Sequence, residues 1–182
     1  MPLPIFAAFA APAAAITTKT VLATLGASVL GTNFAESFVD NVFRDKVHPD
    51  IGSVLYVDML FGRAEHSGIY VGNGEVVELR GDGLVCKVPA SYFIDDGSLK
   101  MTGVSIYVSS QSGCAVGSEL VAERALSMLG CRRNYNFIFD NCHQFCSGCL
   151  TGNFENSDNF LWMLKHTAQK TIGADEWRVW DR

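Results

Sequence analysis

The stretch HSGIYVGNGEVVEL, residues 66–79, carries the strongest structural signal in this chain of 182 residues. Apolar and β-branched residues fill its first half, and Gly-Asn-Gly at 72–74 supplies a turn of the kind that needs positive φ and joins antiparallel strands. Residues 75–79 then have the pattern of the return strand. The stretch therefore predicts a β-hairpin that begins at a histidine, His66.

Further extended segments surround the hairpin, and helical segments follow it. Strands are predicted within 50–60, 85–94 and 103–110, separated by turn residues. Helices are predicted over 117–130, from Cys142 to about Thr151, and over 157–173, with the first capped at Ser118 and the last at Ser157 or Asp158. This order, strands and then helices, predicts an α+β domain with an antiparallel sheet over residues 46–182.

Residues 1–45 differ in composition from the rest. The first 31 residues contain a single charge, Lys19. A membrane span would need about 20 uninterrupted apolar residues, but Pro4 and Pro12 interrupt this run. No positive region precedes the apolar stretch, as a secretory signal would require. We expect residues 1–45 to form an apolar helical arm or a membrane-associating segment, with residues 1–31 as the candidate contact with a membrane surface.

The overall composition excludes several classes of protein. With 48% hydrophobic and 18% charged residues, the chain is too apolar to be disordered. Its net charge of −5 and the lack of any Lys/Arg block argue against binding to nucleic acid. Six cysteines would permit disulfides, but a chain of this size has core enough without them, so free thiols and a cytoplasmic location are expected.

A second informative stretch, FDNCHQFCSGC at residues 139–149, holds three of the cysteines. Their C-x3-C-x2-C spacing is shared with iron–sulfur enzymes that cleave S-adenosylmethionine. Those enzymes carry the triplet early in a large barrel and favour an aromatic residue where this chain has Gly148. A zinc site through His143 lacks a second pair of ligands at suitable spacing. We therefore expect no metal and no cofactor.

Two other interpretations of the same cysteines concern redox chemistry and simple packing. Cys146-Ser-Gly-Cys149 is a C-x-x-C motif, but such a motif opens a helix after a strand in redox proteins, whereas this one falls inside a helix. On a helix that begins at Cys142, all three cysteines share one face, which is typical of small core residues.

The remaining interpretation is a single nucleophile, Cys142. A thiol at a helix start lies near unpaired backbone N–H groups, which lower its pKa and can bind an oxyanion. His66 is the best-placed base because a strand holds it rigidly, and Glu78 on the return strand can orient it, with Asp58 as a weaker option. The residues alone also allow a buried strand histidine and a core cysteine with no catalytic role.

HSGIYVGNGEVVEL (66–79) together with RALSMLGCRRNYNFIFDNCHQFCSGCLTG (124–152) resembles the lecithin:retinol acyltransferase-like proteins, which are circularly permuted papain-like cysteine enzymes. The resemblance covers roughly residues 50–170. It implies a permuted papain-like fold in which the histidine-bearing strand of an antiparallel sheet packs against a cysteine-bearing helix. It also implies that residues 46–182 form a catalytic domain.

The resemblance assigns roles position by position. It implies that Cys142 is the nucleophile and His66 the base, while the third polar residue, usually a second histidine, falls on Glu78. The family's Asn-Cys-Glu-His-Phe box is Asn-Cys-His-Gln-Phe here, which leaves Asn141 and His143 as candidate oxyanion or support residues. An aromatic oxyanion helper of some animal members is replaced by Ala64.

The function implied is that of a cysteine-dependent acyltransferase or a lipid acyl hydrolase of the phospholipase A type, acting through an acyl-thioester. Its partner would be a lipid or another acyl-carrying small molecule. Two alternatives stay open: a cysteine peptidase or amidase of the permuted papain group, and a non-catalytic module that retains the fold.

Overall fold

The computed structural model describes residues 46–59, 64–95, 105–134 and 141–182. The sheet strands are β1 (Val54–Met59), β2 (Ala64–Gly72), β3 (Glu75–Leu79), β4 (Val85–Pro89), β5 (Ile106–Gln111), β6 (Cys114–Ala115) and β7 (Glu176–Val179). The helices are α2 (Ala90–Ile94), α3 (Glu119–Ser127), α4 (Cys142–Thr151) and α5 (Leu161–Ile172). The predicted segment 1–45 lies outside the described residues.

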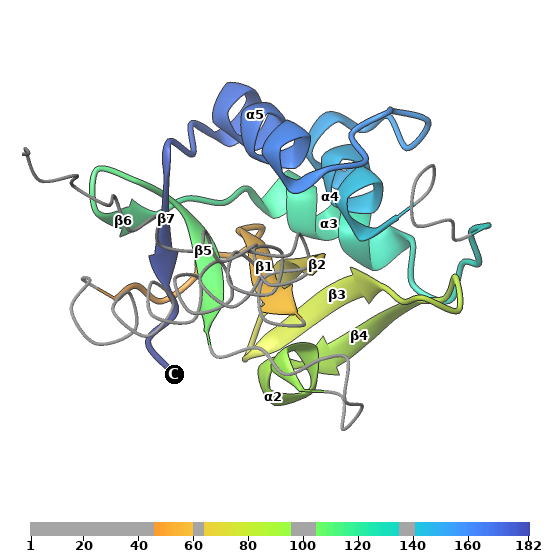
Figure 1. Cartoon of the computed structure of the whole chain (residues 1–182), viewed down its shortest axis with the longest axis horizontal. Coiled ribbons are helices and arrows are strands. Elements are labelled where there is room, and N and C mark those ends of the chain that lie inside the picture. The colour runs from red at the N-terminus through yellow and green to blue at the C-terminus, as the bar shows by residue number, and fades with distance from the viewer. Residues whose placement is uncertain (1–45, 60–63, 96–104, 135–140) are drawn as a thin grey trace, which may run out of the picture.

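The strands form one antiparallel sheet in the order β4-β3-β2-β1-β5-β6, with β7 also paired to β5 (Figure 1). β1 and β2 occupy its centre, where β-branched and aromatic residues such as those of VLYVDM suit a pleated surface buried on both sides. The fold is therefore α+β with an antiparallel sheet and helices, which confirms the predicted class and is consistent with a papain-like arrangement.

The β2–β3 hairpin forms as the sequence predicts, except that β2 begins at Ala64 and not at His66. Gly72 pairs with Glu75, so Asn73 and Gly74 make a two-residue loop, and their φ angles are 53° and 74°. Positive φ at both positions matches the twist of the flanking strands, and Asn-Gly adopts it at low cost. After a register shift between Tyr70 and Gly72, the pairing places Glu78 opposite Gly68, so His66 and Glu78 lie toward the same end of the hairpin.

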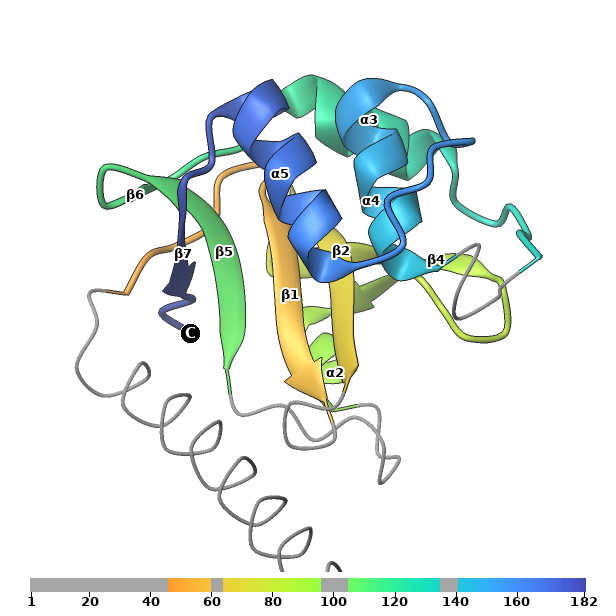
Figure 2. The same ribbon diagram turned by 45° about the horizontal axis from the view of Figure 1, so that its top comes forward.

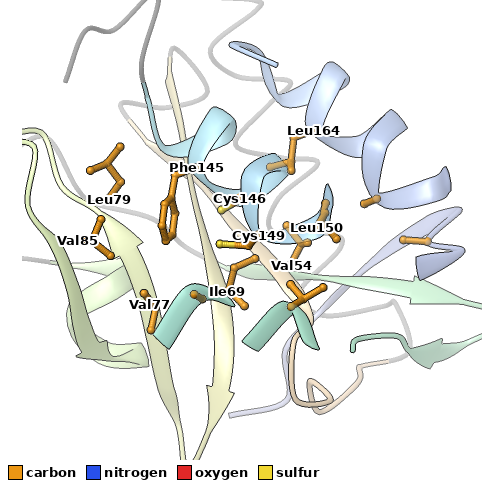
Figure 3. Packing of buried hydrophobic residues seen from close by; sticks show 14 residues of the cluster. Val54, Ile69, Val77, Leu79, Val85, Phe145, Cys146, Cys149, Leu150 and Leu164 are labelled. Atoms are coloured by element: carbon orange, nitrogen blue, oxygen red, sulfur yellow. The ribbon is translucent and has the colours of Figure 1, made fainter. Parts of the chain in front are cut away.

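Helices α3, α4 and α5 gather over one face of the sheet, and α2 lies on the other side (Figure 2). The main core fills the space between these helices and the sheet: Phe145, Cys146, Cys149 and Leu150 of α4 point toward Ile69, Val77 and Leu79, with Leu164 of α5 behind them (Figure 3). A second apolar cluster, which includes Leu55, Val57 and Phe93, covers the opposite face. The central strands are therefore buried on both faces.

α4 is buried along nearly its whole length, from Cys142 to Leu150. Small residues on its surface allow neighbours to approach closely: a Cβ added at Gly148 would overlap the ring of Phe154. Arg124 of α3 donates to the carbonyl groups of Cys149 and Leu150 at 3.0 and 2.9 Å and so ties the end of α4 to α3. These contacts hold the C-terminal end of α4 against α3 and Phe154.

Several predicted element boundaries are wrong. The strand expected over 85–94 ends at Pro89, and its second half is α2. α3 has Ser118 at its N-cap position as predicted, although that side chain makes no capping hydrogen bond, and the helix ends at Ser127 rather than near residue 130. α5 begins after Phe160 rather than at Ser157 or Asp158. β7, near the end of the chain, was not predicted.

No helix among the described residues has the length and apolar character needed to span a bilayer. The six cysteines all lie in described segments, and each is a free thiol. Of these, Cys142, Cys146 and Cys149 are buried in α4.

Candidate active site

Cys142 occupies the first position of α4, and its side chain is only 3% exposed. The preceding residue, Asn141, caps the helix: its side-chain oxygen accepts hydrogen bonds from the amides of His143 and Gln144 at 3.0 and 3.2 Å. The cap satisfies two of the first amides of the helix, while helix geometry gives the amide of Cys142 no acceptor within the helix. The sulfur and this amide therefore lie together at the positive end of the helix dipole.

The sulfur lies where β2 and β3 separate. The β2–β3 pairing ends at Gly68 and Glu78, because the chain turns away after Leu79 and the amide of Arg80 bonds to the carbonyl of Leu84. The amide of Tyr70 points toward the β1 side, where it donates to Ser53, and amide directions alternate along a strand. The amide of Ser67 accordingly points toward the vacated β3 side, where it donates to the sulfur of Cys142.

His66 and Glu78 form a buried pair beside this sulfur. The Nε2 atom of His66 lies 2.8 Å from Oε2 of Glu78, and the two residues are 7% and 2% exposed. Glu78 is directly opposite Gly68 rather than His66, so it reaches the imidazole diagonally across the strands. With Nε2 bonded to the carboxylate, Nδ1 is the ring nitrogen left to face the thiol.

The charges of these groups reinforce one another. Burial alone would raise the pKa of Cys142, but the charge and hydrogen bond of His66, with hydrogen bonds from Ser67, outweigh it and lower that pKa below its ordinary value. Burial would lower the pKa of His66, but the thiolate of Cys142 and the carboxylate of Glu78 raise it to about 10. The arrangement therefore favours a thiolate–imidazolium pair near neutral pH.

The other cysteines of α4 have the opposite character. Burial raises the pKa of Cys146 and of Cys149 well above the ordinary thiol value. Both are fully buried in the main core (Figure 3). They remain neutral thiols that pack, and among the three cysteines of the stretch only Cys142 has a lowered pKa.

The two candidate support residues are both engaged with neighbouring elements. Besides capping α4, Asn141 donates from Nδ2 to the carbonyl of Asn159 at 2.7 Å, so its amide group is held by the loop before α5. Nδ1 of His143 lies 3.0 Å from Oγ of Ser67. Burial, with a smaller effect of the charge on His66, lowers the pKa of His143 to about 4, so this imidazole is neutral at pH 7.

The structure thus brings Cys142, His66 and Glu78 together at one point, although their catalytic roles stay a prediction. Asp58, the weaker option for the third residue, lies directly opposite Glu65, and side chains alternate along β2, so Asp58 faces away from His66. Ser67 was not predicted, although it contacts the sulfur. Its position next to His66 was visible in the sequence, but its contact with α4 depends on the separation of β2 from β3.

A family model described as Lecithin retinol acyltransferase matches residues 47–155 of the chain. The matched range includes the β2–β3 hairpin with His66 and Glu78, and the whole of α4 with Cys142. A search of curated proteins finds no match.

Proposed function

The chain belongs to the lecithin retinol acyltransferase family, and from this premise we propose that it is a cysteine-dependent acyltransferase or lipid acyl hydrolase that works through an acyl-thioester at Cys142. Family membership by itself suggests acyltransferase or thiol-enzyme activity in general. The observation that carries the finer proposal is the buried sulfur of Cys142 beside an imidazole that Glu78 holds at 2.8 Å.

The proposed reaction begins with the proton of Cys142 on His66. The thiolate attacks the carbonyl carbon of an ester, and the carbonyl oxygen gains the negative charge. The amide of Cys142, which has no acceptor within α4, is the candidate donor to that oxygen. As the intermediate collapses, the C–O bond breaks, and His66 returns its proton to the departing alcohol.

The second half of the reaction frees the sulfur. Water, an alcohol or an amine attacks the thioester while His66 takes the proton of the attacking group. The C–S bond breaks and Cys142 leaves as a thiolate beside the imidazolium. Glu78 stabilises the imidazolium in both halves because its carboxylate is bonded to the Nε2 atom.

Incubation with mixed phospholipids tests the proposal directly. Mass spectrometry of the intact protein is expected to detect an acyl adduct, and peptide mapping should locate it on Cys142. Cys142→Ala should abolish the adduct, whereas Cys146→Ala, a matched change in the same helix, should retain it. A Cys142→Ala protein with unchanged adduct formation and turnover would contradict the proposal.

A thiol probe separates an enzyme from a non-catalytic module with the same fold. Iodoacetamide near neutral pH is expected to label Cys142 faster than Cys114 and Cys131, although those two are exposed and Cys142 is buried. Uniformly slow labelling would favour the module. Cleavage of a peptide amide without any phospholipid adduct would point to a peptidase or amidase instead.

Membrane contact through residues 1–31 is a separate part of the proposal, supported by the apolar composition of that segment. The full chain is expected to sediment with phospholipid vesicles, and a Phe6→Glu, Phe9→Glu variant should sediment less. Equal sedimentation of both proteins would remove this segment from the proposal while leaving the chemistry at Cys142 intact.

A further inference from the structure

Ser67 lies in an unusual position for a strand residue beside a candidate nucleophile. It is fully buried and follows His66 in β2, so the two side chains leave the strand on opposite faces. His66 points toward Glu78 on one face, and Ser67 points toward α4 on the other. The sulfur of Cys142, at the edge where β2 and β3 separate, is within reach of both side chains.

The hydroxyl of Ser67 has two neighbours on α4 that matter for its single proton. Its Oγ atom lies 3.0 Å from Nδ1 of His143, and hydrogen bonding from Ser67 is among the causes that lower the pKa of Cys142. A hydroxyl donates one hydrogen and accepts others, so it cannot donate to both neighbours at once. The direction of the two bonds is therefore set by which neighbour needs a donor more strongly.

A thiolate accepts hydrogen bonds and cannot donate them, whereas a neutral imidazole can present an N–H at Nδ1. His143 is buried, and a positive charge on it would face the imidazolium of His66, so the neutral form is favoured. Cys146 also borders Ser67, but as a neutral thiol it does not require the hydroxyl proton. The thiolate of Cys142, the hydroxyl of Ser67 and Nδ1–H of His143 all have hydrogen-bond partners when the proton of Ser67 points to Cys142.

We propose that His143 and Ser67 form a hydrogen-bond relay to the nucleophile, in which Nδ1–H of His143 donates to Oγ of Ser67 and the hydroxyl of Ser67 donates to the sulfur of Cys142. Ser67 touches the reacting atom and is a catalytic residue in this sense, while His143 is a positioning residue that acts through it. The inference rests on the proposed function, because it concerns the same thiolate.

The relay gives the thiolate a donor that is independent of the proton on His66. During the proposed reaction His66 gives up its proton and regains it, whereas the hydroxyl and amide of Ser67 keep their hydrogens throughout. Both groups of Ser67 thus stabilise negative charge on sulfur when Cys142 leaves the thioester. His143 in place of the family's glutamate suits this purpose, since a glutamate carboxylate would accept the proton of Ser67 and draw it away from sulfur.

The test is the pH dependence of Cys142 alkylation by iodoacetamide, followed by mass spectrometry that resolves each cysteine. Ser67→Ala is expected to shift the apparent thiol pKa upward by about one unit, the effect of losing a hydrogen bond to a charged group. His143→Leu should give a smaller upward shift. His143→Asn, whose side-chain N–H can occupy the place of Nδ1–H, should remain close to the unmodified protein.

The double variant Ser67→Ala, His143→Leu separates a relay from simple packing. If His143 acts through Ser67, the double variant should show the same shift as Ser67→Ala alone. Ser110→Ala, a fully buried serine in β5 whose hydroxyl bonds to the carbonyl of Val108, is the matched control and should leave the profile unchanged. Melting curves confirm that each variant is folded.

An unchanged profile for folded Ser67→Ala would overturn the relay, and so would a further shift when His143→Leu is added to it. The assay needs no acyl substrate. If the Ser67 and His143 variants shift the pH profile as expected but no substrate yields an acyl adduct, the proposed function is contradicted and the relay is not. If an adduct forms on Cys142 but Ser67→Ala leaves the pH profile unchanged, the relay is contradicted and the proposed function is not.

Discussion

Replacing Glu78 by glutamine tests the electrostatic basis of the candidate site. Glu78→Gln keeps the shape of the side chain and removes its negative charge. Glu78 is 2% exposed, and its Oε2 atom lies 2.8 Å from Nε2 of His66, so water cannot substitute for the lost carboxylate. The change therefore acts on the imidazolium directly and on the thiolate of Cys142 through it.

The size of the effect follows from the kind of contact that is lost. A hydrogen bond to a charged group contributes about 1.5–3 kcal/mol, and one pKa unit corresponds to about 1.4 kcal/mol. The pKa of His66 should fall by roughly one to two units. The ratio of the thiolate–imidazolium pair to the neutral thiol–imidazole pair should fall by about 10- to 100-fold. Because the pKa of His66 starts at about 10, the imidazolium persists in part at pH 7, and alkylation of Cys142 there is expected to slow by at most about 10- to 100-fold.

The assay is the rate of iodoacetamide labelling of Cys142 between pH 4 and 10, with labelling of exposed Cys131 in the same sample as the internal control. Glu78→His, which installs the residue of the family pattern, should fall between the native protein and Glu78→Gln, because a neutral imidazole can hold His66 but adds no negative charge. A Glu78→Gln protein with native labelling at every pH would refute the electrostatic role assigned to this carboxylate.

Three further predictions concern the pH range and the packing of α4. The lowered pKa of Cys142 and the raised pKa of His66 predict a bell-shaped dependence of kcat/KM on pH. Activity should fall at acid pH as the thiolate is protonated and at alkaline pH as the imidazolium loses its proton. A profile that falls on one side alone would argue against a thiolate–imidazolium pair. Gly148→Ala should lower Tm by roughly 2–10 °C because its Cβ would overlap the ring of Phe154, whereas Gly81→Ala, whose Cβ meets no atom within 4 Å, should leave Tm nearly unchanged. Asn141→Ala should cost about 1 kcal/mol of stability through the lost cap, measured by urea unfolding, and Asn153→Ala in an exposed loop should cost less.

The sequence predicts the hairpin well because its signals are local. An Asn-Gly turn with two positive φ angles determines the loop between β2 and β3 without help from the rest of the chain. The start of α4 is likewise local, since Asn141 caps the helix through its own two following amides. His66, Glu78 and Cys142 could therefore be placed on the correct elements before the fold was known.

Other features depend on tertiary contacts and could not be predicted. The segment SYFI of α2 has β-forming residues, but Pro89 ends the preceding strand and Phe93 becomes a fully buried part of the second apolar cluster. Asp158, a plausible cap for α5, instead receives a hydrogen bond from Thr167 within that helix. β7 is a short strand of four residues that pairs with β5, far away in the sequence.

The separation of β2 from β3 also determines when the environment of Cys142 forms during synthesis. The hairpin emerges from the ribosome long before Cys142, and until α4 docks against Ser67 and His66 that cysteine is an ordinary thiol on an exposed segment. Its activation therefore requires the tertiary structure and cannot arise in a nascent or unfolded chain. The difference between the lowered pKa of Cys142 and the raised pKa values of Cys146 and Cys149 therefore arises only when the chain folds.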